Sequence, residues 1–248
     1  MDLPSLVRDA LVVFFAYLCG SIPVGVIVAR LTGGPDPRTI GSGRIGGTNA
    51  LRALGPRRAA VVAVGDVAKG FVPAATALVI VGDPLVVSLA GLAAIVGSMR
   101  SIFLGFGGGR GVSTGIGTML AIAPLAIVLA SPVFFVVIAR TRYVSAGSLV
   151  GSAAAAVITA ILWALPGFVT PLVYVAYAGL GAGLIWAAHR DNIDRLMAGT
   201  ERQLDFGSLV GRGGAPRGPG SSRDPGTGAA GDVTAPGSDS GTDGAGTG

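Results

Sequence analysis

The chain has very little of what most metal and disulfide sites require: one cysteine and one histidine in 248 residues. The single cysteine, Cys19, excludes an internal disulfide framework and cysteine-based metal sites. The single histidine, His189, excludes multi-histidine metal sites. Charged residues make up only 12% of the chain, which is about half the share of a typical soluble domain. The composition therefore indicates a polytopic membrane protein.

What the chain has instead is apolar sequence, with 51% hydrophobic residues and a mean hydropathy of +0.70. A helix that crosses the bilayer core needs about 20 mostly apolar residues. Candidate spans cover 10–31, 59–81, 85–104, 112–130, 132–139, 149–165 and 170–188. The fifth is too short to cross unaided, so it is either a half-span or a span that borrows residues from either side of Pro132. The count is therefore six or seven. The first stretch lacks a small-residue cleavage site, so we interpret it as a span and not as a cleaved signal.

The arginines decide between six and seven spans. With seven, most arginines fall in loops that share one side of the membrane, namely 32–58, 105–111, 140–145 and the stretch from 189 onward. With six, they scatter over both faces. The apolar spans predict an all-α fold, a polytopic membrane helix bundle with about seven transmembrane helices. Because basic loops stay in the cytoplasm, we predict that the N-terminus lies outside and the C-terminus is cytoplasmic.

The formal net charge is +5, and Lys69 is the only lysine. In a membrane protein this balance indicates loop charge that faces anionic headgroups or substrates, so no nucleic-acid partner is predicted. We expect residues 1–206 to form the transmembrane domain. Residues 207–248 are rich in Gly, Ser, Pro and Asp and hold too few large apolar side chains to form a core, which predicts a disordered cytoplasmic tail.

Two glycine- and arginine-rich loops interrupt the apolar sequence. The first, 41–49, is followed by Arg52 and offers Ser42, Arg44, Thr48 and Asn49. The second, 105–112, places Arg110 directly before a helix expected to start near 112–114. Glycine-rich backbone beside a fixed cation and a helix N-terminus is typical of an anion site. The alternatives are a tight connector for the first loop and a short flexible hairpin for the second. The Walker A pattern is absent.

Two further polar groups stand out. Asp66 and Lys69 lie three residues apart on one face of an apolar span, where charges normally pair with each other. The pair either locks helices together or borders a site, and we favour the structural role slightly.

At the end of the last span, His189 and Asn192 lie one turn apart, and Arg195, Thr200 and Glu201 follow. This pattern favours a polar site element over an ordinary interfacial histidine. Ser145 and Ser148 we interpret as helix-cap residues.

Together, these segments resemble the membrane-integral acyl-phosphate:glycerol-3-phosphate acyltransferases of bacteria, the PlsY family. The resemblance runs from about Cys19 to Glu201 and rests on the joint order of 20–25, 41–52, 66–70, 105–114, 142–145, 189–193 and 199–201. It implies seven spans with the N-terminus outside, in a multi-pass protein of a bacterial plasma membrane. It also implies transfer of a fatty acyl group from acyl phosphate to the 1-hydroxyl of glycerol 3-phosphate. The product is lysophosphatidic acid, for phospholipid synthesis.

The resemblance also implies the site. Catalytic roles fall to Ser42, His189 and Asn192, and substrate binding falls to Thr48, Asn49, Arg52, Gly108, Gly109, Arg110 and Glu201. Acyl phosphate, glycerol 3-phosphate and membrane lipids are the expected partners. Neither a cofactor nor a metal is implied. The sequence gives no oligomeric state and no acyl-chain preference.

The chain departs from the family pattern at its first and second motifs. Arg44 stands where the first motif usually has Asn. In the second motif, Ser98 replaces a His, Gly107 replaces one Lys and Arg110 replaces another, and 100–101 replaces Phe-Pro. These changes favour an alternative hypothesis: a divergent paralogue, non-catalytic or of altered specificity, that binds a phosphorylated lipid or headgroup. A third hypothesis, a small transporter, is disfavoured because no inverted repeat is visible and the polar loops gather on one face.

Overall fold

The computed structural model describes residues 2–204, and the regular secondary-structure elements of this part are all helices, which confirms the predicted all-α class. The α-helices are α1 Leu3–Ser21, α2 Val24–Leu31, α3 Gly47–Leu54, α4 Pro56–Ile80, α5 Pro84–Met99, α6 Val112–Ile122, α7 Pro124–Thr141, α8 Val144–Ala164, α9 Leu172–Ala188 and α10 Arg190–Met197. Two short 3₁₀ turns, Pro37–Thr39 and Ile102–Leu104, lie in the connections. The predicted tail, 207–248, lies outside the described residues.

Seven apolar helices, α1 and α4 to α9, correspond to the seven predicted spans. By length and composition, α1, α4, α7 and α8 can each cross a membrane, and α9 joins them when it is taken together with α10, from which it is bent by 63°. The helices α5 and α6 are apolar but shorter. The 11 residues of α6 reach only about 16 Å, roughly half of the hydrocarbon core.

The predicted first span, 10–31, is wrong at both of its limits. The helix α1 begins earlier, at Leu3, where the Asp2 carboxylate accepts a hydrogen bond from the backbone N–H of Ser5 at 3.3 Å. It ends at Ser21, and the short α2 begins at Val24. The break falls at Pro23, because a proline disfavours helical backbone in the residue before it.

The predicted fourth and fifth spans, 112–130 and 132–139, are also divided at the wrong proline. The helix breaks at Ala123 and Pro124, where Pro124 forms the first turn of α7. Pro132 lies inside α7, which continues to Thr141. The fifth span is thus a full-length helix, and the fourth, α6, is the short one.

Close glycine contacts hold the helices together. A Cβ at Gly117 of α6 would lie 2.0 Å from the Val67 carbonyl oxygen of α4, and one at Gly20 of α1 would lie 2.1 Å from the Ala94 carbonyl oxygen of α5. Small residues at such crossings let backbones approach within direct contact, which is how helices associate in lipid. The central helix α5 presents Val87, Ala90 and Ala94 to the core with no exposed surface.

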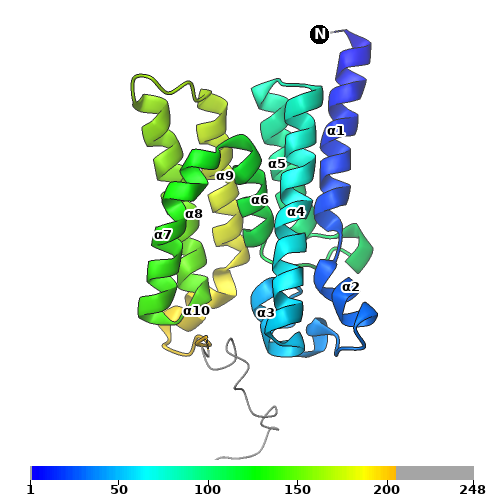
Figure 1. Cartoon of the computed structure of the whole chain (residues 1–248), viewed down its shortest axis with the longest axis vertical. Coiled ribbons are helices and arrows are strands. Elements are labelled where there is room, and N and C mark those ends of the chain that lie inside the picture. Colours follow the sequence, from blue (N-terminus) through cyan, green and yellow to red (C-terminus); the bar gives the residue numbers. More distant parts are fainter. Residues whose placement is uncertain (1, 205–248) are drawn as a thin grey trace, which may run out of the picture. The chain divides into compact units, whose positions relative to one another are not determined.

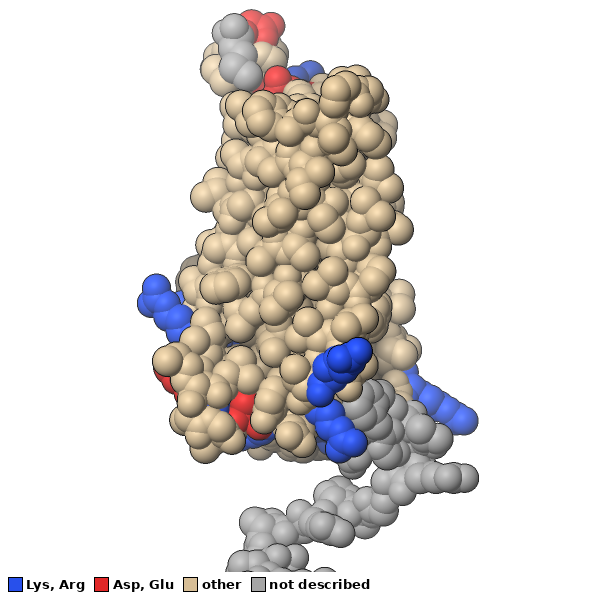
Figure 2. All heavy atoms as spheres, turned by 90° about the vertical axis from the view of Figure 1, so that its left-hand side faces the viewer, with Lys and Arg blue, Asp and Glu red and all other residues tan. Residues whose placement is uncertain are grey.

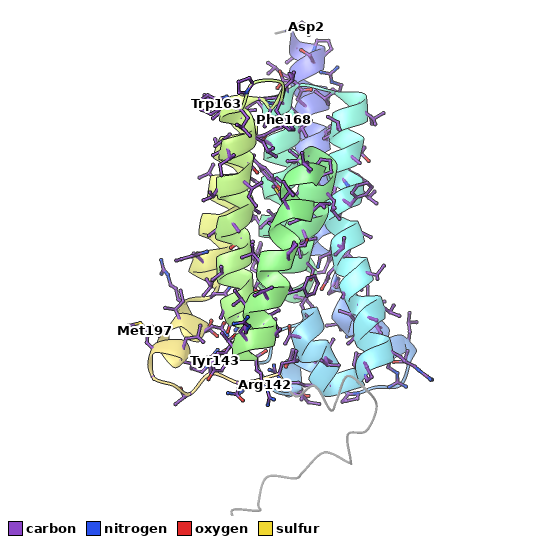
Figure 3. All side chains as sticks on the ribbon, turned by 60° about the vertical axis from the view of Figure 1, so that its left-hand side comes forward. Asp2, Arg142, Tyr143, Trp163, Phe168 and Met197 are labelled. Carbon is purple, nitrogen blue, oxygen red and sulfur yellow. The ribbon has the colours of Figure 1, made fainter. Side chains whose placement is uncertain are left out.

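The helices α2, α3 and α10 gather at one end of the bundle, and the N-terminal end of α1 lies at the other (Figure 1). Charged side chains lie toward the two ends on the face drawn in Figure 2, and the surface between them is uncharged. Figure 3 places Arg142, Tyr143 and Met197 at the α10 end and Asp2, Trp163 and Phe168 at the opposite end. The segments that the arginine pattern assigned to one side therefore do meet at one end of the bundle.

Candidate active site

A polar cavity of about 160 Å³ lies at the α10 end of the bundle. Its walls bring together the two glycine-rich loops and the segment after α9. Of the predicted site residues, it is lined by Ser42, Thr48, Asn49, Arg52, Gly109, Arg110, His189, Asn192 and Glu201. Gly108 is not among the lining residues. A Cβ at Gly108 would lie 2.5 Å from the Ser98 carbonyl oxygen, so this glycine packs the loop against the end of α5.

Asn49 organises the first loop from within. Its side chain is buried, and its Nδ2 donates to the carbonyl oxygens of Pro37, Ile40 and Arg44 at 2.7, 3.0 and 2.8 Å. Its Oδ1 accepts from the backbone N–H of Ser42 at 3.0 Å. The amide is therefore fully engaged with the backbone, and it fixes the curve of the loop that carries Ser42 and Arg44.

Arg110 joins the second loop to α10. Its Nη2 donates to Asp191 Oδ2 at 3.1 Å, and the same carboxylate oxygen accepts from Arg195 Nη2 at 3.3 Å. Burial lowers the pKa of Arg110, and Asp191 opposes this effect. Burial raises the pKa of Asp191, but Arg110 and Arg195 outweigh it, and the net shift is downward. Both groups therefore remain charged at neutral pH.

Glu201 is the centre of a second polar network. Its Oε1 accepts from Ser145 Oγ at 2.8 Å and from Asn192 Nδ2 at 2.6 Å, while its Oε2 accepts from Arg195 Nε at 2.8 Å. Burial raises the pKa of Glu201, but these three donors outweigh burial and the net shift is downward. The carboxylate thus links the start of α8 to α10.

His189 lies between α9 and α10 and is only 2% exposed. Its Nδ1 lies 2.8 Å from the carbonyl oxygen of Ile185. Because a carbonyl can only accept, Nδ1 carries the proton, and the neutral ring keeps a lone pair on Nε2. Burial lowers the pKa of His189 to about 4, with a smaller contribution from Arg110. The side chain is therefore neutral at physiological pH.

The starts of three helices line the cavity. Gly46 and Gly47 begin α3, Gly111 and Val112 begin α6, and Val144 follows the N-cap of α8. None of these helices has a side-chain hydrogen bond at its N-cap. The positive end of each helix dipole thus contributes to an anion-binding environment.

The charges of the cavity wall are strongly unbalanced. The basic lining residues are Arg44, Arg52, Lys69, Arg110, Arg195 and Arg202, and the acidic ones are Asp66 and Glu201. Lys69 Nζ lies 2.8 Å from Asp66 Oδ1 and also donates to the Ile22 carbonyl oxygen at 3.1 Å. The Asp66–Lys69 pair therefore has both of the roles that the sequence left open. It connects α4 to the break between α1 and α2, and it borders the site.

The wall also holds hydroxyl groups that sequence reasoning did not assign to the site: Ser98, Ser113, Thr114, Ser145 and Ser148. The prediction that Ser145 and Ser148 cap a helix is wrong, because the N-cap of α8 is Tyr143. The sequence did contain a usable signal, because Ser145 and Ser148 lie at the start of an apolar stretch, directly after the basic turn that holds Arg142.

Four buried polar atoms that belong to residues of the cavity wall have no hydrogen-bond partner within residues 2–204. One of them, Asp66 Oδ1, is engaged in the ion pair with Lys69, and the other three are Arg110 Nε, Thr114 Oγ1 and Asn192 Oδ1. An unpaired buried polar atom is costly in a folded protein. These donors and this acceptor are therefore available to a bound molecule.

The altered motif positions fall in different places. Arg44 and Ser98 line the cavity. Gly107 is exposed and does not line it; its backbone pairs with Ser101 in the turn before Arg110. The cation that the resemblance leads one to expect at position 107 is thus absent, while Arg44 brings a cation from the first loop.

An apolar chamber of about 190 Å³ adjoins the polar cavity. It lies among α5, α6, α7, α8 and α9, and four residues line both spaces: Val112, Ile116, Phe134 and Ser148. A hydrophilic group and an apolar chain could therefore occupy one continuous site.

Sequence comparison agrees with this geometry. A family model described as glycerol-3-phosphate acyltransferase matches residues 10–199. A curated relative named glycerol-3-phosphate acyltransferase, from Thermus thermophilus, is 46% identical over 189 residues, which cover 76% of this chain and 92% of the relative. Another, glycerol-3-phosphate acyltransferase 3 from Dehalococcoides mccartyi, is 40% identical over 207 residues, with 79% and 95% covered.

Solved structures are similar as well. The crystal structure of PlsY (YgiH), an integral membrane glycerol 3-phosphate acyltransferase, in its glycerol 3-phosphate form, matches with a TM-score of 0.75 and 35% identity. The lysophosphatidic acid form of PlsY matches with a TM-score of 0.72 and 33% identity. Each match covers 82% of this chain and 98% of the PlsY chain.

Proposed function

The chain belongs to the glycerol-3-phosphate acyltransferase family, and from this premise we propose the reaction that its cavity carries out. A fatty acyl group passes from acyl phosphate to the 1-hydroxyl of glycerol 3-phosphate, which gives lysophosphatidic acid and inorganic phosphate. The reaction supplies phospholipid synthesis at a bacterial plasma membrane, with the cavity open to the cytoplasm.

The observation that carries this proposal is the union of a cationic cavity with an apolar chamber. Both substrates are phosphorylated, and one of them has a long apolar chain. The cavity offers guanidinium groups and three helix N-termini to phosphoryl oxygens. The chamber begins at Phe134 and Ser148, where the cavity ends. The reacting carbonyl carbon would lie at this junction.

The basic residues divide between phosphate binding and framework. Arg195 and Lys69 pair with carboxylates inside the wall, and Arg110 uses Nη2 for Asp191 but keeps Nε unpaired. Arg52 and Arg110 therefore bind the phosphoryl groups, and Arg44 adds charge from the first loop. Asn49 and Glu201, which are engaged within the protein, position these groups.

No protein nucleophile is required, because acyl phosphate is already activated. The 1-hydroxyl oxygen of glycerol 3-phosphate attacks the acyl carbon, and the bond to the phosphate oxygen breaks. The hydroxyl proton passes to the departing phosphate. His189 and Asn192 complete the polar network of the cavity wall, and Ser42 orients the glycerol. Positioning and fixed cations supply most of the rate enhancement.

The alternative of a non-catalytic paralogue is not favoured. The third motif is complete, and its residues His189, Asn192 and Glu201 all line the cavity. Curated relatives at 40% and 46% identity are named as acyltransferases. The chain lacks a cation at position 107, but Arg44 contributes a cation to the cavity wall from the first loop.

The test is direct. The purified full-length protein is incubated with palmitoyl phosphate and radiolabelled glycerol 3-phosphate, and lipid products are separated. We expect lysophosphatidic acid in an amount that depends on both substrates, and no product when glycerol replaces glycerol 3-phosphate. Absence of lysophosphatidic acid both with palmitoyl phosphate and with shorter acyl phosphates would end the proposal, and failure to rescue a bacterium that lacks its own first-step acyltransferase would reinforce that result.

A further inference from the structure

The apolar chamber has a definite depth. Along α9 it is lined from Ile185, near the polar cavity, to Tyr177. Along α7 it is lined from Phe135 to Ile127. Each of these stretches advances eight residues in helix register, which is about 12 Å. A methylene chain built from C–C bonds of about 1.5 Å advances about 1.3 Å per carbon, so about nine carbons reach from one end to the other.

Two glycines make the chamber hollow. A Cβ at Gly181 would lie 3.6 Å from Ile95 Cδ1, and a Cβ at Gly115 would lie 3.4 Å from Ile185 Cδ1. These are ordinary contacts, unlike those of Gly117, where a Cβ would strike the neighbouring backbone at 2.0 Å. Helix packing therefore does not require glycine at 115 or 181. Side chains at positions 115 and 181 would fill part of the chamber, so the two glycines keep this space open.

A fixed aromatic ring lines the far end of the chamber. Tyr177 is 2% exposed, and its hydroxyl donates to Thr118 Oγ1, which is fully buried. Thr118 Oγ1 donates in turn to the Gly115 carbonyl oxygen at 2.9 Å. On its other side the ring lies against α5, where a Cβ at Gly91 would come within 2.8 Å of Tyr177 Cε2. A buried hydroxyl is costly without its hydrogen bond, so this arrangement holds the ring in one position.

We propose that Tyr177 is the end wall that the acyl chain meets, and that Tyr177 and Gly181 together set the acyl-chain-length profile of the enzyme. This inference rests on the proposed function and adds to it a specificity determinant. Long-chain donors are already surrounded by lipid, so burial in the chamber gains them little hydrophobic free energy. Selection by length is therefore steric, and it depends on the space between Gly181 and Tyr177.

The experiment compares two donors in each variant: palmitoyl phosphate, and butyryl phosphate, whose chain extends only about 4 Å beyond its carbonyl carbon and stops short of Gly181, which lies about 6 Å from Ile185 in helix register. In Gly181→Leu, we expect the palmitoyl-to-butyryl ratio of kcat/KM to fall about tenfold or more, which is the size of effect that one or two extra methylenes have in an apolar pocket. Gly179→Leu is the matched control, because Gly179 lies on the same helix, is exposed and has no atom within 4 Å of its Cβ position. Its ratio should equal that of the wild type.

Two further variants test the wall. Tyr177→Phe keeps the ring and should keep the chain-length profile. Tyr177→Ala should raise kcat/KM for donors longer than about ten carbons, relative to kcat/KM for butyryl phosphate. Turnover of butyryl phosphate shows that each variant is folded. The inference is overturned if Gly181→Leu and Gly179→Leu give the same ratio, or if Gly181→Leu loses both donors equally. An inactive wild type with every donor would overturn the proposed function instead.

Discussion

Arg110 is fixed in place through Asp191, and its Nε has no partner among the described residues. At the scale of single residues this geometry makes a prediction. In Arg110→Ala, kcat/KM for glycerol 3-phosphate acylation should fall about 10²-fold, as when one preorganised donor to a developing negative charge is removed. Initial rates of lysophosphatidic acid formation measure the effect.

The matched control is Arg140→Ala. Arg140 is an exposed arginine in the last turn of α7 and does not line the cavity. Its removal changes the net charge by the same amount, and the rate should remain within a factor of about two, as expected for an exposed charge. Equal losses in both variants would show that Arg110 acts only through overall charge.

His189 gives the protein a specific sensitivity to acid. Because burial lowers the pKa of His189 to about 4, the unfolded chain binds a proton below about 6.5 that the folded protein does not. As the pH falls from about 6 to about 4.5, the free energy of unfolding should therefore decrease by about 1 kcal/mol per pH unit. Asp191 and Glu201 have lowered pKa values, so their contribution is lost only at lower pH.

The measurement is thermal unfolding in detergent across this pH range. In His189→Gln, the amide can still donate to the Ile185 carbonyl, but nothing titrates. The variant should lose less stability than the wild type between about pH 6 and pH 4.5. Parallel curves for the two proteins would refute the neutral, buried state of His189.

Sequence reasoning could predict which residues belong to the site but not what each one does. Asn49 lies in a loop of the right composition, and it lines the cavity as expected. Its hydrogen bonds to Pro37, Ile40 and Arg44 depend on the three-dimensional path of the loop, which no spacing rule gives. Ser145 was missed as a site residue for a related reason, because its partner Glu201 lies 56 residues away.

At the scale of helices, the contact between α4 and α6 is the most demanding. In Gly117→Leu, a side chain would have to fit where a Cβ lies 2.0 Å from the Val67 carbonyl oxygen. The two backbones must separate, so we expect the protein to lose about 3 kcal/mol or more of stability, at the upper end of overpacking effects. Thermal unfolding in detergent would measure it, with Gly183→Leu as the control, because Gly183 is exposed and has open space around its Cβ position.

Hydropathy limited the number of apolar helices to six or seven and the arginine pattern favoured seven, but the ends of the helices were not predictable. Pro124 and Pro132 are both preceded by apolar stretches, and each is compatible with a helix break. A proline in the first turn of a helix loses no hydrogen bond, whereas one in the interior loses one. Which of these occurs depends on packing against neighbouring helices, and the sequence pattern alone could not choose Pro124.

At the scale of the whole molecule, the orientation in the membrane remains a prediction from the arginines. After Cys19 is replaced by Ser, single cysteines are introduced at Thr39, Met197 and Val169, which are all exposed. In intact cells, a membrane-impermeant thiol reagent should label Val169→Cys only. The cysteines at 39 and 197 should react after the membrane is permeabilised. Labelling of 39 and 169 from the same side would contradict the arrangement.

The polar cavity crowds like charges when it holds no anion. Arg44 lies close enough to Arg110, and Arg202 to Arg52, for each pair to repel. A bound phosphate relieves this repulsion, and a ligand that binds only the folded state raises its melting temperature by mass action. Heat resistance thereby becomes a reporter of site occupancy. Millimolar glycerol 3-phosphate should raise the melting temperature more than glycerol at matched ionic strength, before any turnover is measured.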